Sequence, residues 1–185
     1  MYPNKIKKNY KAVISHSNRG MDLENLINLS NTYYLKENIA LIYKKPTPIG
    51  VSKVKFLDNK KIIDKAYFKE QSTLDYNGLY RGKYIDFDAK NTTNKTSFPL
   101  SNIHSHQVEH IRQVLKHGGI AFIILRMNNN FFLITGNTLV FFVDNMKRKS
   151  IPYTYIVENG YLIEETYQPA LDYLKIIDEI YFKGE

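Results

Sequence analysis

One eight-residue stretch constrains the fold of this chain more than any other. Residues 120–127 read Ile-Ala-Phe-Ile-Ile-Leu-Arg-Met, which is apolar throughout except for Arg126. A strand of this kind carries apolar side chains on both faces, so both faces must be covered by other elements. The run has the length of a strand and is too short to span a membrane as a helix. The sequence therefore predicts a sheet with a central strand that is buried on both sides.

The remainder of the chain alternates helical and extended patterns. Apolar residues recur at helical spacing in three segments, and strand-sized runs separate them. Helices are expected over residues 19–36 (with Asn18 as N-cap), over residues 104–117, and from Pro169 onward. Strands are expected over residues 39–45, 49–57, 60–68, 85–90 and 131–135, in addition to 120–127. Strands interleaved with helices favour the α/β class.

Three segments between these elements are less regular. Residues 91–102 are rich in Thr, Ser and Asn and are expected to form a loop over the sheet. Residues 139–146 fit a strand or a helix equally well. Residues 153–157 and 161–165 are expected to pair as a hairpin around Asn159-Gly160.

Length and charge limit the domain organisation and the class of partner. A chain of 185 residues fits one domain, which buries roughly 70% of its unfolded surface. Residues 1–18 are polar and basic and are interpreted as a mobile arm, and residues 19–185 as a single domain. The chain has 26 basic and 18 acidic residues, a net charge of +8. Such an excess suits a polyanion such as nucleic acid, although a compositional bias toward Lys, Asn, Ile and Tyr is an alternative explanation.

Absent residue types exclude several kinds of site. The chain has no cysteine, which excludes disulfides, thiolate zinc sites and cysteine nucleophiles. The N-terminal lysines are not followed by an apolar core, as a signal peptide would require. We therefore expect a cytoplasmic protein without a membrane segment.

The polar residues of one strand suggest a catalytic site. Within residues 85–90, Ile85, Phe87 and Ala89 fall on one face, whereas Asp86, Asp88 and Lys90 fall on the other. Asp75 lies on a separate strand-like piece that could pair alongside. Two carboxylates brought together could share Mg²⁺, which prefers hard oxygen ligands, and the lysine would add a fixed positive charge. The pattern indicates metal-dependent phosphodiester hydrolysis, but a salt-bridged surface pair of strands fits the spacing almost equally well.

Two further side chains lie where they could reach this site. Gln107 falls toward the core side of its predicted helix, and a glutamine in that position needs polar partners. Glu24 lies beside the apolar stripe of the first helix, where an ordinary solvent-facing role is equally plausible.

Other catalytic motifs are absent or weak. His104, His106 and His110 are close in sequence, but Gln107 follows His106, so they do not form the His-Glu-x-x-His zinc pattern. Solvated helix histidines explain them better than zinc does. Neither a Gly-x-Ser-x-Gly elbow nor a phosphate-binding glycine-rich loop occurs.

The extended pair over residues 49–69 is basic and aromatic. It is expected to be a ribbon around an Asp58-Asn59 turn. Aromatic rings on such a ribbon could stack on DNA bases, or the pair could be an ordinary hairpin with solvated lysines.

Several short stretches of the sequence together resemble those of a known family. Asp75 followed by Asp88-x-Lys90 resembles the PD-(D/E)xK nuclease superfamily, and the surrounding stretches are similar to the RecU family of Holliday junction resolvases. These stretches are Asn-Arg-Gly-Met-Asp-Leu-Glu (18–24), Lys-Lys-Pro-Thr-Pro-Ile (44–49), the segment from Asp75 to Lys90, Lys-Thr-Ser-Phe-Pro-Leu (95–100), His-Gln-Val-Glu-His (106–110) and Leu-Asp-Tyr-Leu-Lys (171–175). They span nearly the whole chain and are more specific than the catalytic spacing alone.

The resemblance implies a restriction-endonuclease-like fold, in which helices flank a mixed central sheet and a basic stalk within residues 49–69 protrudes. It implies Thr73, Asp75, Asp88 and Gln107 as a Mg²⁺ site at which Mn²⁺ could substitute. It implies Lys90 as transition-state stabiliser, so that Asp75, Asp88 and Lys90 are the catalytic residues. The family usually has glutamate in place of Asp88, and the shorter side chain moves the carboxylate by roughly 1.5 Å.

The remaining site residues are expected in supporting or DNA-binding roles around this site. Glu24 and Arg19 are expected in supporting roles. The expected DNA-binding residues are Lys53, Lys55, Lys65, Phe68, Arg81 and Lys95.

The activity that the resemblance implies is paired cutting of a four-way DNA junction by a symmetric homodimer during recombination and repair. RecA recombinase and a branch-migration helicase are the implied protein partners. Three alternatives stay open: a sequence-specific restriction-type endonuclease, a non-catalytic junction-binding or recombinase-modulating protein, and an RNA-binding module.

Overall fold

The central strand expected from the sequence is present in the computed structural model, which describes residues 22–68 and 73–183. Strand β7 (Ile120–Met127) lies inside a six-stranded sheet and is buried along almost its whole length. Its side chains alternate between two apolar cores: Phe122 and Ile124 face one, whereas Ile123 and Leu125 face the other. The expected α/β class, with a mixed sheet flanked by helices, is confirmed.

The sheet is mixed because one of its pairings is parallel. Strand β5 runs parallel to β7, and the other neighbouring pairs are antiparallel. The strand order is β1-β4-β5-β7-β8-β10. The remaining five strands are β1 (Leu41–Lys44), β4 (Tyr76–Tyr80), β5 (Lys83–Asn91), β8 (Asn130–Thr135) and β10 (Tyr161–Ile163).

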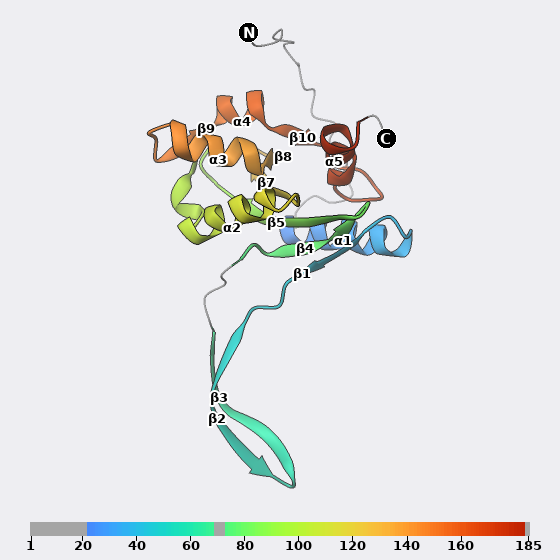
Figure 1. Cartoon of the computed structure of the whole chain (residues 1–185), viewed down its shortest axis with the longest axis vertical. Coiled ribbons are helices and arrows are strands. Elements are labelled where there is room, and N and C mark those ends of the chain that lie inside the picture. Colours follow the sequence, from blue (N-terminus) through green and yellow to red (C-terminus); the bar gives the residue numbers. More distant parts are fainter. Residues whose placement is uncertain (1–21, 69–72, 184–185) are drawn as a thin grey trace.

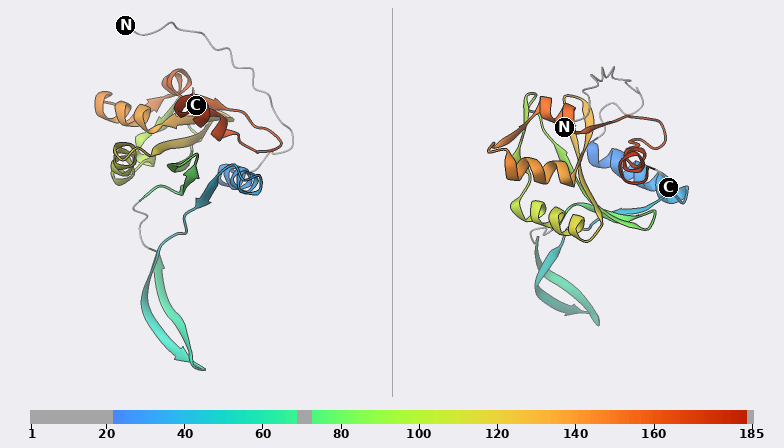
Figure 2. Two further views of the ribbon diagram at one scale, coloured as in Figure 1. Left: turned by 45° about the vertical axis from the view of Figure 1, so that its right-hand side comes forward. Right: turned by 45° about the horizontal axis from the view of Figure 1, so that its top comes forward.

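Helices cover the two faces of this sheet (Figure 1). Helices α1 (Leu23–Lys36) and α5 (Tyr173–Tyr181) contribute to one core. Helices α2 (Ser105–Lys116), α3 (Gly136–Asn145) and α4 (Tyr153–Asn159) contribute to the other. The right-hand view of Figure 2 shows α2 and α3 side by side, well apart from α1 and α5.

A long hairpin projects from this body. Strands β2 (Ile49–Leu57) and β3 (Lys60–Phe68) pair only with each other within the described sheets. Asp58 and Asn59 have φ angles of 47° and 60°, the backbone of the tight turns that suit the twist of a hairpin. The hairpin stands away from the sheet in every view (Figures 1 and 2). The expected turn and both strand ranges are confirmed.

Helix α2 begins and ends as its sequence indicates. The His104 backbone N–H donates to the Gln107 side-chain oxygen at 3.1 Å, which satisfies one polar group at the helix start. The helix ends before Gly118, whose φ of 78° lies in the region that favours glycine. The helix therefore presents Gln107, Val108, Ile111 and Val114 to the sheet.

Two helix predictions need correction, and one segment that was left open is now decided. Helix α1 begins at Leu23 with Asp22 at its N-cap, later than expected, and Asn18 and Arg19 lie outside the described residues. Helix α5 begins at Tyr173, because residues 165–171 first form a small loop closed by a bridge between Glu165 and Leu171. The ambiguous segment 139–146 is helical in α3.

The expected hairpin over residues 153–165 is wrong. Residues 153–159 form helix α4, because Tyr153, Ile156 and Val157 recur at helical spacing and pack on the α2–α3 core. Residues 161–163 instead add β10 to the edge of the main sheet beside β8.

The loop expected over residues 91–102 is also partly wrong. Strand β6 (Ser97–Pro99) pairs with β9 (Ser150–Pro152), and a 3₁₀ turn, η2 (Leu100–Asn102), follows it. Across the described residues, none of the helices combines the length and apolar character that crossing a membrane requires.

Candidate active site

The pairing of β4 with β5 creates the candidate site. Tyr76 lies opposite Phe87, so Asp75, the residue before β4, lies next to Asp88. Ile85 and Phe87 point into the α1–α5 core, and the alternating residues point toward α2. The structure therefore brings Asp75, Asp88 and Lys90 to one place.

Asp88 is held by three donors. Its side chain is 1% exposed, and Lys90 Nζ lies 2.8 Å from its Oδ2. Gln107 Nε2 donates to the same oxygen at 2.7 Å, and the backbone N–H of Ala89 donates to Oδ1 at 2.9 Å. A buried carboxylate with these partners has a fixed orientation.

Asp75 is perturbed by its surroundings. Burial raises its pKa to about 7, and a hydrogen bond to Asp88 and repulsion by that carboxylate act in the same direction. Glu24 raises the pKa further, whereas Lys90 opposes the shift. Asp75 therefore keeps its proton to a higher pH than an ordinary carboxyl group does when no cation lies beside it.

The donor set fits a hard divalent cation. Two adjacent carboxylates that repel each other are stabilised when a cation neutralises them. Gln107 could add an amide oxygen, although this oxygen also accepts from His104 N–H. Within residues 22–68 and 73–183 no group of three or more His, Asp or Glu side chains is arranged to hold a metal, so the site depends on two acids.

Thr73, the remaining expected metal ligand, and Glu24, an expected supporting residue, each contact a lysine. The Thr73 hydroxyl accepts from Lys45 Nζ at 3.3 Å. Glu24 forms an ion pair with Lys44. Arg19 lies outside the described residues.

Sequence reasoning placed Asp86 on the polar face of β5 but gave it no role, and the structure shows it as a second buried carboxylate. It is 0% exposed, and Lys45 Nζ donates to both of its oxygens at 2.9 Å. The Tyr84 hydroxyl donates to it at 2.8 Å, and His110 Nε2 lies at the same distance. Asp86 shares a strand face with Asp88, and this alternation was the available signal; its partners come from distant elements.

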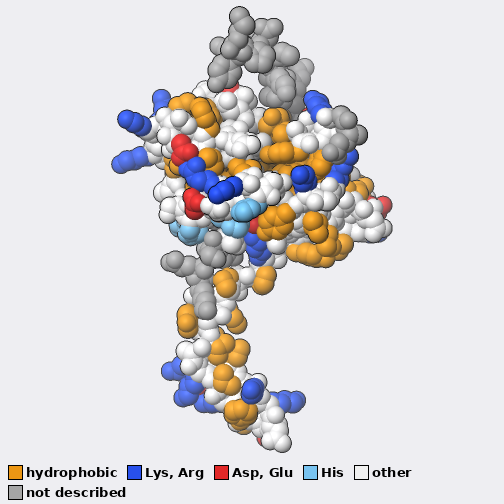
Figure 3. Space-filling view, in the orientation of Figure 1, with side chains coloured by type: hydrophobic (Ala, Val, Ile, Leu, Met, Phe, Trp, Pro, Cys, Tyr) orange, Lys and Arg blue, Asp and Glu red, His pale blue; other side chains and the backbone are white. Residues whose placement is uncertain are grey.

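Most of the expected DNA-binding residues lie on the hairpin. Lys53 and Lys55 both pair with Asp64 on its surface. Phe68 is 80% exposed at the hairpin base. Figure 3 shows apolar side chains along the hairpin and basic side chains gathered toward its far end.

The other expected DNA-binding residues lie elsewhere on the body. Arg81 pairs with Asp178 at 3.1 Å and stacks over the Phe182 ring, so α5 already engages it. Lys95 is exposed in the segment before β6, and its carbonyl accepts from Asn128. Lys65, in contrast, is exposed on β3 of the hairpin.

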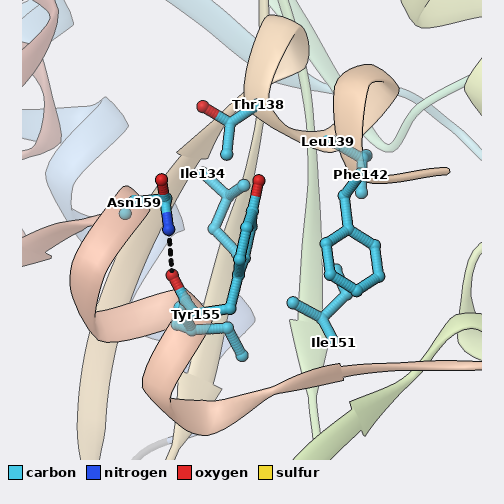
Figure 4. A pocket seen from close by; sticks show the side chains of 9 residues that line it. Ile134, Thr138, Leu139, Phe142, Ile151, Tyr155 and Asn159 are labelled. Atoms are coloured by element: carbon cyan, nitrogen blue, oxygen red, sulfur yellow. Dashed lines mark hydrogen bonds between the residues drawn. The ribbon is translucent and has the colours of Figure 1, made fainter. Parts of the chain in front are cut away.

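The remaining histidines and the apolar pocket hold no comparable chemistry. His104 and His106 stack on each other with ring centroids 5.3 Å apart. A pocket between α3 and α4 is lined by side chains such as Phe142 and Ile151, without a charged residue (Figure 4). Its Asn159 side chain donates to the Tyr155 carbonyl, within the same helix.

Comparison with known proteins places the chain in a family. Residues 18–179 match the family model described as RecU, recombination protein U. The Holliday junction resolvase RecU of Geobacillus sp. (strain WCH70) is 48% identical over 174 residues, which cover 91% of this chain and 87% of that protein. The protein of the same name from Bacillus thuringiensis (strain Al Hakam) is 47% identical over the same coverage.

A solved structure also matches. It is that of Hjc, a Holliday junction resolvase of Archaeoglobus fulgidus, with a TM-score of 0.41 and 9% identity over 71% of this chain and 91% of that one. The family model and the relatives cover most of the sequence, including both acids of the site. The chain belongs to the RecU family.

Proposed function

We propose that this protein is a divalent-metal-dependent endonuclease that resolves four-way DNA junctions. The observation that carries the proposal is the convergence of Asp75, Asp88 and Lys90 where the start of β4 meets the end of β5. The names of the RecU relatives, which are Holliday junction resolvases, support the choice of substrate.

Each residue then has a role that follows from its contacts. Asp75 and Asp88 would hold Mg²⁺, with Mn²⁺ as a substitute, and Thr73 and Gln107 would complete the ligand set. A bound ion of this kind supplies an activated water and offsets charge on the phosphate. Gln107 orients Asp88 through its hydrogen bond, and Lys90 places a fixed positive charge beside the phosphate.

A homodimer would relate two such sites by a twofold axis, which suits paired cutting of two like strands. Exposed apolar side chains at the edge formed by α1, β1 and β4 support this proposal, and they gather on the body in Figure 3. They are Leu35, Ile39, Leu41 and Leu79. Light scattering on the purified protein would test the dimer.

Three finer points rest on the family resemblance. We propose action in the cytoplasm, with RecA recombinase and a branch-migration helicase as partners. We also propose that residues 19–185 form one nuclease domain, preceded by a basic arm of residues 1–18 that lies outside the described residues.

The decisive experiment uses a labelled immobile four-way junction with and without Mg²⁺. Asp75→Asn should lose at least about a hundredfold in cleavage while binding the junction as well as before, because losing a negative charge does not weaken attraction to phosphates. Glu109→Gln, an exposed acid on α2, is the matched control. Wild-type cleavage by Asp75→Asn would refute the assignment.

Competing substrates separate the alternative functions. A linear duplex that contains the same sequences would be cut if the protein were a restriction-type enzyme. A junction that is bound but uncut in Mg²⁺ and Mn²⁺ would indicate a non-catalytic protein. Preference for an RNA competitor would indicate an RNA-binding module.

A further inference from the structure

The two strands of the projecting hairpin have almost no buried contacts that could fix the direction in which the hairpin points. Every residue of β3 is exposed, and so is every residue of β2 except Gly50. Among the described strands, these two pair with none of the main sheet. A two-stranded ribbon without a packed face is not rigidly placed by itself. Its direction therefore depends on the contacts where it joins the body.

We call residues 45–48 and 73–75 the hairpin root. Lys45 links these two segments to each other. The Lys45 backbone N–H donates to the Asp75 carbonyl at 2.7 Å. Lys45 Nζ donates to the Thr73 hydroxyl at 3.3 Å. These bonds connect the chain that enters the hairpin with the chain that returns from it.

The same ammonium also reaches the strand that carries the candidate active site. It donates to both oxygens of Asp86, and the pair is shielded: Lys45 is 19% exposed and Asp86 is 0% exposed. Tyr84 and His110 hold Asp86 from β5 and α2. Because Asp86 lies two residues before Asp88 on one strand face, the hairpin root is tied directly to the site.

The preceding lysine makes a different contact. Lys44 projects from the opposite face of its strand and pairs with Glu24 of α1. That pair is 42% and 40% exposed, and solvent-exposed pairs hold geometry weakly. A shielded pair with several hydrogen bonds is far more costly to break, so Lys45 is the stronger constraint of the two.

We propose that Lys45 and Asp86 are positioning residues that fix the direction of the hairpin relative to Asp75 and Asp88, and thereby select branched over linear DNA. The choice of substrate rests on the function proposed above. A branched molecule meets the hairpin and the cutting site at two separated points, so a fixed relation between them favours one shape. When that relation is loosened, a linear duplex reaches the site as readily as a junction does.

The direction of the hairpin can be measured without any activity. The chain has no cysteine, so spin labels can be attached through Lys60→Cys at the hairpin turn and Lys116→Cys at the end of α2. Double electron–electron resonance then gives the distribution of distances between them. Lys45→Met should broaden this distribution and the matched control Lys44→Met should not. Equal widths in the two variants would overturn the proposal.

Selection is tested by competition between a labelled junction and a linear duplex of the same sequence. Lys45→Met should reduce the preference for the junction roughly tenfold, whereas Lys44→Met keeps it. If Lys45→Met does not fold, the double variant Lys45→Met/Asp86→Asn is used in its place. It removes both charges of the pair, so that no unpaired charge stays buried. A uniform loss of cutting with unchanged preference would contradict the role in selection. If the wild type cuts no junction, the proposed function fails, and the label distances still decide whether Lys45 positions the hairpin.

Discussion

The raised pKa of Asp75 predicts that cation binding depends on pH. Burial, the hydrogen bond to Asp88 and repulsion by it raise the pKa of Asp75 to about 7. A cation binds the ionised carboxylate, so it must displace the proton. With this pKa, about 0.9 proton should be released per cation near pH 6, about 0.5 near pH 7 and about 0.1 near pH 8. The apparent affinity should rise about tenfold across the same range, because the ionised share of Asp75 rises by that factor.

Isothermal titration calorimetry without DNA measures both quantities. Mg²⁺ is titrated in pairs of buffers with different ionisation enthalpies, and the difference in heat gives the number of protons released. Asp75→Asn should abolish the pH dependence together with most of the binding, whereas Glu109→Gln should retain both. A wild-type protein that releases no proton near pH 6 would refute the reasoning, since Asp75 would then already be ionised at that pH.

Three further predictions concern stability and DNA binding. Phe87→Ala should lower the free energy of unfolding by about 3–5 kcal/mol, because the ring is buried between two others; Phe56→Ala on the hairpin should change it by less than about 0.5 kcal/mol, and urea denaturation compares them. Gln107→Leu should cost about 1–3 kcal/mol in the same assay, because a buried carboxylate loses a donor. Replacing Lys53 and Lys55 with Ala should reduce the slope of log affinity for junction DNA against log salt by up to about 2; an unchanged slope in filter binding would exclude them from the DNA interface.

Local sequence patterns determined the elements whose burial is periodic. The apolar run of β7 requires cover on both faces whatever the neighbours are, so the layered sheet followed from it. Alternation in β5 placed Asp88 and Lys90 on one side, and a short antiparallel pairing was enough to bring Asp75 beside them. The turn at Asp58-Asn59 is encoded locally because both residues tolerate positive φ.

Residues 153–163 show where local pattern failed. Their aromatic and β-branched residues favour strands, yet packing on the α2–α3 core makes the first part helical and leaves only Tyr161–Ile163 to pair with β8. The choice depended on which apolar surface was available, and that surface is built by distant residues.

The Asp86 cluster likewise depended on tertiary structure. Lys45 and Asp86 are 41 residues apart in sequence, and no spacing rule connects them. They meet because β4 lies between β1 and β5 in the sheet and because α2 brings His110 over the same face. The sequence by itself determined which faces are apolar and which carry charge. The order of the strands decided which charged residues are buried together, because that order sets the contacts between residues far apart in the chain.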